Sequence, residues 1–536
     1  MNEVSMKVNQ ANLVKGLKYS FTNKTTVLGE LMQNARRAGA NQVVFNFDPV
    51  TRSLRISDDG CGIESLEALL TIAESGWDTH IVAEEHPFGI GFLSALFACK
   101  KITVSSKSGY LSVRTADVLS FKPVTVEQIT CWNGVTEILL QEVDITEDGI
   151  KSALEKLASG FSIPVIFNNK VLDRGCSINS GLQFISTEIG GIYLSGLDTP
   201  YSGSHIAFKV FLQGLPIYSS HDYLYGYDYH VIHLDSSSFY ARLPDREKLI
   251  NEDDVIVRIK DVLVKEIEKS LISMRNTLPP EEFVKYFYIM RDYGLLRLLN
   301  DVPVAPVQAL GEIIEPPHCE TDYFGSFIED IKEPLSRCEI EEIGVVQFDE
   351  YIHDDGSELH LFAMSRGNLI FRDCLDKDHW LNSMIQKINQ DEVLVEMPNE
   401  SRSSYFEGYY TYFEVWFCDS FKINVGNDTV EIRDQALFTG NDGSCTAIIP
   451  KGYYSTDILK QVSTYTDEYD VFQESAWETD VNDFEAFLAA NTTNDPVVAI
   501  KRLLPNFKGC PLLYGESFIL TLNKQGIVES VTASAA

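Results

Sequence analysis

Three short polar motifs, in a fixed order between Glu30 and Gly91, constrain this chain more than any other feature of its sequence. The first is Glu30 and Asn34, four residues apart within an apolar repeat of helical period over residues 27–35. Side chains at that spacing project from one side of a helix, about 5–6 Å apart at their Cβ atoms. The pair predicts a carboxylate that accepts a proton from a water, beside an amide oxygen that ligates Mg²⁺. An exposed polar helix face is the alternative.

The second motif is a glycine loop at the end of an expected β-hairpin. Alternating apolar residues at 43–47 and 54–56 predict two strands, and Asp58, Gly60 and Gly62 follow the second one. Asp58 is placed to accept a hydrogen bond from an exocyclic amino group, and the glycines let backbone approach a flat ring. A plain Asp-Gly turn is the alternative interpretation.

The third motif is a glycine pair before an apolar helix. Gly89 and Gly91 precede the stretch from Phe92 to Ala98, so backbone N–H groups at a helix N-terminus are expected to face phosphate oxygens. Such a pair is weak evidence alone. In this order and spacing, the three motifs together favour a pocket for a nucleoside triphosphate.

The motifs resemble those of the Bergerat-fold (GHKL) ATPases, the superfamily of gyrase, heat-shock protein 90, histidine kinases and mismatch-repair L proteins. The resemblance covers roughly residues 10–275 and is strongest to the heat-shock protein 90-like ATPases, whose lid segment is similar to residues 71–76. It implies that Glu30 is the general base and that Asn34 holds Mg²⁺. It also implies an ATP-binding set: Asn34, Asp58, Gly60, Gly62, Ile63, Gly89, Ile90, Gly91, Phe92 and Thr136.

A second catalytic residue follows from the same resemblance. Residues 242–247 are similar to the chaperones' catalytic loop, in which an arginine reaches the γ-phosphate, and Arg246 is the matching position. An arginine there would stabilise charge in the transition state. A surface ion pair with Asp245 or Glu247 is the alternative.

Three positions depart from the superfamily's pattern. Arg37 stands where an acidic residue is usual, His86 replaces a glycine of the phosphate motif, and Trp77 replaces a small hydroxyl residue. We therefore expect nucleotide binding to be retained and turnover to be slow or conditional.

The predicted fold class is α+β, in four parts. Residues 1–172 should form a Bergerat-fold sandwich, a mixed sheet covered by helices, and 173–300 a middle domain like ribosomal S5 domain 2. Prolines mark 301–318 as a linker, and 319–536 are expected to be mixed and rich in β-structure. Within these parts we expect a helix over 281–299 and a hairpin pairing 345–348 with 359–363.

Charge bounds the partners. The net charge is −34; residues 1–150 hold 13 Lys and Arg against 18 Asp and Glu, whereas residues 301–536 hold 15 against 42. So acidic a surface repels nucleic acid and favours a protein client or dedicated partner. The absence of a membrane-length apolar run, of a signal-peptide core and of Cys-x-x-Cys pairs favours a cytoplasmic protein with free thiols. A homodimer is possible by analogy with dimeric members of the superfamily.

The sequence thus predicts Mg²⁺-dependent ATP hydrolysis that drives a conformational cycle, as in a heat-shock protein 90-like chaperone or a partner-regulating ATPase. Two alternatives remain open. One is a DNA-maintenance ATPase of the mismatch-repair or topoisomerase type, which the acidic C-terminal part disfavours. The other is an ATP-bound scaffold that does not hydrolyse its nucleotide.

Overall fold

The computed structural model describes residues 9–20, 23–72, 77, 89, 91–198, 200, 207–220, 229–242, 246–319, 321–348, 356–372, 374–389, 392–441, 444–504 and 507–533. The chain divides into two compact units, residues 1–295 and 296–536. Each unit has its own sheets and its own cores.

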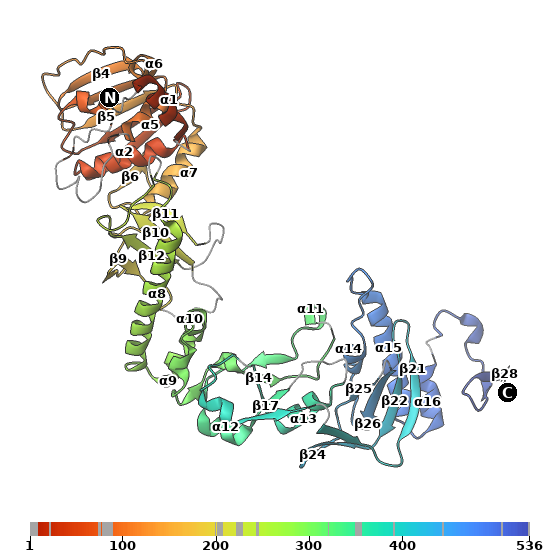
Figure 1. Ribbon diagram of the computed structural model, residues 1–536. Coiled ribbons are helices and arrows are strands. Elements are labelled where there is room, and N and C mark those ends of the chain that lie inside the picture. Colours follow the sequence, from red (N-terminus) through yellow and green to blue (C-terminus); the bar gives the residue numbers. More distant parts are fainter. Residues whose placement is uncertain are drawn as a thin grey trace, which may run out of the picture. The chain divides into compact units, whose positions relative to one another are not determined.

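Unit 1 begins with a seven-stranded mixed sheet of order β4-β3-β5-β2-β1-β6-β7 (Figure 1). All its pairs are antiparallel except β1 with β6. The strands are β1 (Val43–Asp48), β2 (Ser53–Asp58), β3 (Lys101–Ser106), β4 (Gly109–Arg114), β5 (Thr136–Gln141), β6 (Val165–Phe167) and β7 (Lys170–Val171). The expected hairpin is confirmed, since Val43 pairs with Asp58 and Phe47 with Leu54.

Helices accompany this sheet and share its core. They are α1 (Gln10–Ser20), α2 (Thr26–Arg37), α3 (Leu66–Leu70), α5 (Gly91–Ala98), α6 (Thr115–Leu119) and α7 (Glu147–Ala158). Buried residues of α2, α5 and α7 form one cluster with those of the strands, and α2 touches both other helices (Figure 1). The apolar repeat of α2 therefore does what its period predicts: Leu28, Leu31 and Met32 are buried.

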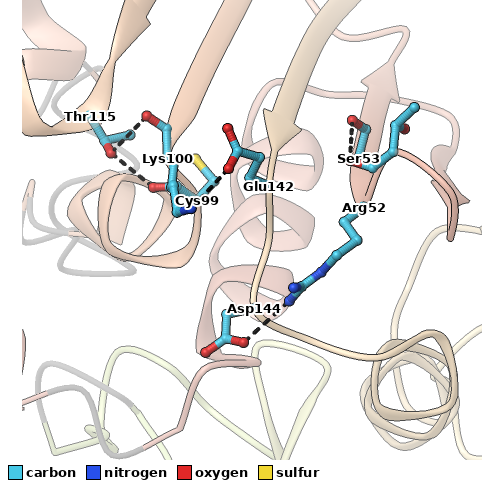
Figure 2. Close-up of polar contacts among 8 residues, drawn as sticks. Arg52, Ser53, Cys99, Lys100, Thr115, Glu142 and Asp144 are labelled. Carbon is cyan, nitrogen blue, oxygen red and sulfur yellow. Dashed lines mark hydrogen bonds and ion pairs between the residues drawn. The ribbon is translucent and has the colours of Figure 1, made fainter.

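Polar contacts fix the strand ends of this domain, as Figure 2 shows. The Thr115 hydroxyl, at the start of α6, donates to the carbonyl oxygen of Lys100 (3.2 Å). The Lys100 ammonium lies 2.9 Å from Glu142 Oε2, and Arg52 in the β1–β2 turn lies 3.2 Å from Asp144 Oδ1. The two ion pairs are exposed; they join the loops at one end of β3, β5 and β2 and contribute little to stability individually.

Unit 1 also holds a five-stranded sheet of order β11-β10-β12-β9-β8 followed by a long helix, and we refer to this sheet and the helices after it as the second domain. Its elements are β8 (Ile185–Thr187), β9 (Gly190–Tyr193), β10 (Ala207–Leu212), β11 (Leu215–Ser219), β12 (Tyr229–Leu234), α8 (Glu252–Arg275), α9 (Pro280–Phe283), η1 (Val284–Tyr286) and α10 (Phe287–Asp292). The single helix expected over 281–299 is wrong. Gly294 has φ +66°, which ends α10, and the short 3₁₀ helix η2 (Leu296–Leu299) follows.

Unit 2 carries two larger sheets, of order β15-β14-β18-β17-β19 and β21-β22-β26-β25, and a three-stranded sheet β20-β23-β24. The strands of the first sheet and the helices beside it are β14 (Leu310–Ile313), β15 (Ile328–Asp330), β17 (Val345–Phe348), β18 (Leu369–Phe371), β19 (Ile385–Ile388), α12 (Arg337–Ile343) and α13 (Glu358–Arg366). The other strands and the following helices are β20 (Val393–Glu396), β21 (Arg402–Glu407), β22 (Tyr412–Cys418), β23 (Phe421–Val425), β24 (Asp428–Ile432), β25 (Leu437–Asn441), β26 (Ser444–Pro450), α14 (Ile458–Val462), α15 (Glu474–Asn491) and α16 (Pro496–Leu503). A final hairpin joins β27 (Phe518–Leu522) to β28 (Val528–Ala533).

Two expectations for this half differ from the structure. Residues 359–363 lie in the helix α13 rather than in a hairpin strand, and β17 pairs with β18 and β19 instead. Residues 304–313, expected to be part of a linker, contribute β13 (Val304–Ala305) and β14, and Ala305, Ala309 and Leu310 are fully buried. The prolines here lie within a packed segment of the fold and do not mark a linker.

The side chain of Asp480 on α15, in unit 2, has no exposed surface. It accepts hydrogen bonds from the backbone N–H groups of Tyr409, Tyr410 and Thr411 and from the Tyr465 hydroxyl. Charge-assisted bonds of this kind satisfy a carboxylate away from water. They hold the β21–β22 turn against α15.

The cysteines whose side chains are described are free thiols. In the same part of the chain, none of the helices combines the length and the apolar character needed to cross a membrane.

Candidate functional site

Helix α2 places the first motif inside the domain. Glu30 is only 6% exposed, whereas Asn34 is partly buried. The exposed polar face that the sequence allowed therefore does not describe Glu30. Gly39, with φ +69°, follows the end of the helix as its sequence predicted.

Three separate elements meet at the Glu30 carboxylate. A Cβ placed on Gly91, the first residue of α5, would lie 2.0 Å from Glu30 Oε2, so the carboxylate sits directly against that helix N-terminus. Arg246 approaches from the second domain, with its Nε 3.3 Å from Glu30 Oε1. Both side chains are largely buried, at 13% and 8% exposure for Arg246 and Glu30. The structure thus brings together residues 30, 91 and 246. Asp245, one partner in the alternative surface ion pair of Arg246, lies outside the described residues.

Gln213, which the sequence did not single out, lies at this meeting point. It occupies the turn between β10 and β11 with φ +54°, and its side-chain Oε1 accepts from Arg246 Nη1 and from Arg37 Nη2, at 3.3 Å each. Its backbone oxygen accepts from Gln33 Nε2 (2.9 Å). The dipeptide Gln213-Gly214 between two apolar runs indicates a turn, but nothing local in the sequence says what the turn contacts.

The second motif lies at the end of β2. Asp58 pairs with Thr136 of β5 in the strand register, and its Oδ1 accepts from the Gly60 N–H (3.0 Å). Burial raises the pKa of the Asp58 carboxyl above its ordinary value of 3.8, against the opposing effect of that hydrogen bond. A partly buried carboxylate with spare oxygen lone pairs is suited to accept from an amino group.

Each glycine of this loop is required by a close neighbour. A Cβ on Gly60 would lie 2.6 Å from the Cβ of Ala38, just past the end of α2, and one on Gly62 would lie 2.9 Å from the Trp132 ring. Gly62 also has φ +81°, a conformation that favours glycine. The loop is therefore pressed between the end of α2 and Trp132.

A chain of hydroxyl groups joins Ile63 to Thr136. The Ile63 N–H donates to Ser106 Oγ (2.8 Å), and Ser106 Oγ and Thr136 Oγ1 are 2.8 Å apart. Both hydroxyl residues are buried. Ser106 was missed in the sequence because its role depends on the β3–β5 pairing, which brings the end of β3 beside the start of β5.

The third motif is described only in part. Gly89 has φ +66° and Gly91 begins α5, while Phe92 is buried in the domain core. Ile90, His86 and residues 73–76 of the expected lid lie outside the described residues.

The side chains present fit ATP and Mg²⁺. Among the described residues, no group of three or more His, Cys, Asp or Glu side chains could hold a metal by itself. Mg²⁺ usually takes one or two protein oxygens and completes its shell with phosphates and waters. The Asn34 amide, one turn from Glu30 on the same helix, is a suitable protein oxygen.

Comparison with known proteins agrees with these observations for the first domain. Residues 19–142 match the family described as histidine kinase-, DNA gyrase B-, and HSP90-like ATPase. Relatives named chaperone protein HtpG include that of Verminephrobacter eiseniae, 28% identical over 36% of this chain and 35% of the relative. Those of Albidiferax ferrireducens (25% identical, 36% and 35% covered) and Enterobacter sp. (27%, 27% and 30%) are similar.

The chain spans about a third of the length of these relatives. The similarity to the histidine kinase-, DNA gyrase B- and HSP90-like ATPases thus lies in residues 19–142, and the relatives named above are chaperones by name.

Proposed function

We propose that this chain binds ATP with Mg²⁺ and hydrolyses it to ADP and phosphate. We propose further that this hydrolysis drives a conformational cycle of the chain itself, which acts as a heat-shock protein 90-like chaperone or as a partner-regulating ATPase. The observation that carries the proposal is the convergence of the Glu30 carboxylate, the N-terminus of α5 at Gly91 and the Arg246 guanidinium. A base, an anion-binding helix end and a cation are the groups that phosphoryl transfer to water requires.

The residues would share the chemistry as follows. Asp58 accepts a hydrogen bond from the adenine amino group, in the loop held by Ser106 and Thr136. Glu30 orients the attacking water and accepts its proton. Arg246 neutralises charge on the transferring phosphoryl group. Asn34 would hold Mg²⁺, which would supply further neutralisation of phosphate charge.

Steady-state hydrolysis and nucleotide binding, measured on the same samples of wild type, Glu30→Ala and Arg246→Ala, test the proposal. We expect all three to bind ATP and only wild type to turn over. If Glu30→Ala hydrolyses ATP at the wild-type rate, the general-base assignment is wrong. Asn169→Gly, an exposed turn position with φ +67°, serves as the matched control for handling and stability.

A non-hydrolysing ATP-bound scaffold is the second candidate. The observation in its favour is that Arg246 already pairs with Glu30. While this ion pair holds, the carboxylate is not available as a base and the guanidinium is not available to bind phosphate. Wild type that binds ATP and never turns over would establish it. Both candidate functions include a client or dedicated partner that binds the acidic residues 319–536, and both include a cytoplasmic location. Salt-sensitive retention of the protein on DNA would contradict both candidate functions.

A further inference from the structure

The β10–β11 turn is fastened to the nucleotide domain on two sides. The Gln213 backbone oxygen accepts from Gln33 of α2, which is 1% exposed. A Cβ on Gly214 would lie 3.2 Å from the Gly160 carbonyl oxygen and 3.3 Å from Phe161 Cα, so the turn also packs on the connection between α7 and β6. Both turn residues have positive φ, at +54° and +80°.

The Gln213 side chain adds a link of a different kind. One neutral amide oxygen accepts from two guanidinium groups, Arg37 of α2 and Arg246 of the second domain. Two cations gathered on one oxygen repel each other, and Glu30 offsets the charge of Arg246. The Gln213 amide oxygen therefore fixes the positions of both guanidinium groups. Because it is neutral, it leaves Arg246 attracted to negative charge near α5.

We infer that Gln213 is a positioning residue: it holds Arg246 in line with Glu30 and the N-terminus of α5, and couples the β10–β11 turn to α2 through Arg37 and Gln33. This inference rests on the proposed ATPase function. It gives Arg37, which occupies an unusual position for the superfamily, a contact with the second domain. A shift of α2 on nucleotide binding then reaches β10 through the turn, and β12, which pairs with β10, leads toward the loop that carries Arg246.

Two variants separate positioning from packing. Gln213→Gly keeps the positive φ without strain and keeps the backbone oxygen for Gln33, but removes the shared acceptor. Gln213→Glu places a carboxylate between the two guanidiniums and strengthens their attachment. If the role of Gln213 is purely structural, turnover, ATP binding and the protection of α2 from hydrogen exchange should all decrease in Gln213→Gly and all increase in Gln213→Glu. A positioning role predicts that turnover falls in both.

The experiment measures kcat, the ATP dissociation constant and amide hydrogen exchange of α2 in the full chain, with Asn169→Gly as the control. For Gln213→Gly we expect kcat to fall about tenfold, the size of one lost hydrogen bond, with ATP affinity within about twofold. Exchange of α2 amides should rise. For Gln213→Glu, exchange should fall below wild type while kcat also falls, since Arg246 is drawn toward the new charge.

Wild-type kcat in Gln213→Gly, or faster turnover in Gln213→Glu, would overturn the positioning role. Unchanged α2 exchange in both variants would overturn the coupling. If wild type itself does not hydrolyse ATP, the proposed function fails, and hydrogen exchange with and without ATP still decides the coupling: it stands only if the protection of α2 gained on binding ATP is lost in Gln213→Gly.

Discussion

Replacing Gly91 with alanine should displace the Glu30 carboxylate from the position that hydrolysis requires. The added Cβ would lie 2.0 Å from Glu30 Oε2 and 2.8 Å from its carboxyl carbon, whereas ordinary contacts of a Cβ begin at 3.4 Å. The nearer oxygen therefore has to retreat by about 1.4 Å, the difference between the two distances. Since that carboxylate is buried and paired with Arg246, the retreat also disturbs the ion pair.

The expected size of the effect follows from this displacement. A misplacement of about 1 Å in a catalytic group costs roughly 10²-fold in rate. The domain itself should stay folded, because the nearest atoms to the added Cβ all belong to the outer part of one flexible side chain, that of Glu30. Turnover at saturating ATP should fall about 10²-fold, and a separate binding titration reports any loss of affinity at the phosphates.

Gly29→Ala is the matched control, one residue from Glu30. Its Cβ would meet Leu157 and Leu215 side-chain atoms at 3.6 Å, which is ordinary contact. It should leave kcat unchanged and raise the free energy of unfolding by up to about 1 kcal/mol. If Gly91→Ala turns over as fast as wild type and Gly29→Ala, either the carboxylate does not stand against α5 or it is not the base.

Other parts of the chain make three further predictions. Asp58→Asn should abolish ATP binding in an equilibrium titration; in wild type, because burial raises the pKa of Asp58, affinity should begin to fall on acidification at a pH above the ordinary 3.8 of an aspartate. Asp480→Ala leaves three backbone N–H groups and a tyrosine hydroxyl without their acceptor, and should lower the free energy of unfolding of residues 296–536 by about 3–5 kcal/mol, measured by urea denaturation beside Asp480→Asn. Burial lowers the pKa of His230 from 6.5 to about 3. On acidification the imidazole is therefore protonated in the unfolded chain before it is protonated in the folded one. The free energy of unfolding should then fall below pH 6.5, by about 2–3 kcal/mol at pH 4.5. His230→Gln should remove that part of the pH dependence of thermal unfolding.

The parts of the site that the sequence predicted are those set by local periods. Four-residue spacing within an apolar repeat placed Glu30 and Asn34 on α2, and strand alternation placed Asp58 at the end of β2. In both cases the apolar residues determine which face of the helix or strand is buried. The position of the polar side chain then follows from its spacing in the sequence relative to those apolar residues.

Gln213 and Ser106 could not be found in this way. Gln213 is 180 residues from Gln33 along the chain, and Ser106 is 30 residues from Thr136. Their partners are chosen by the docking of one sheet on another domain and by the order of strands in a sheet. No local pattern encodes either. The missed helix α13 has a related cause: residues 358–363 are all buried, Glu358 and His360 included, so the polar residues there do not mark an exposed helix face.

The buried pair of Glu30 and Arg246 links the two functional candidates physically. In the arrangement seen here, the guanidinium that would meet the γ-phosphate is already paired with the Glu30 carboxylate, the proposed general base, 3.3 Å away. A γ-phosphate at the N-terminus of α5 carries more negative charge than a carboxylate and would compete for Arg246, whereas ADP would not. Turnover then requires the ion pair to open first, at a cost in free energy that slows each cycle. The same competition makes the position of Arg246, and of the second domain that carries it, depend on whether the third phosphate is present, as a switch between two conformations requires.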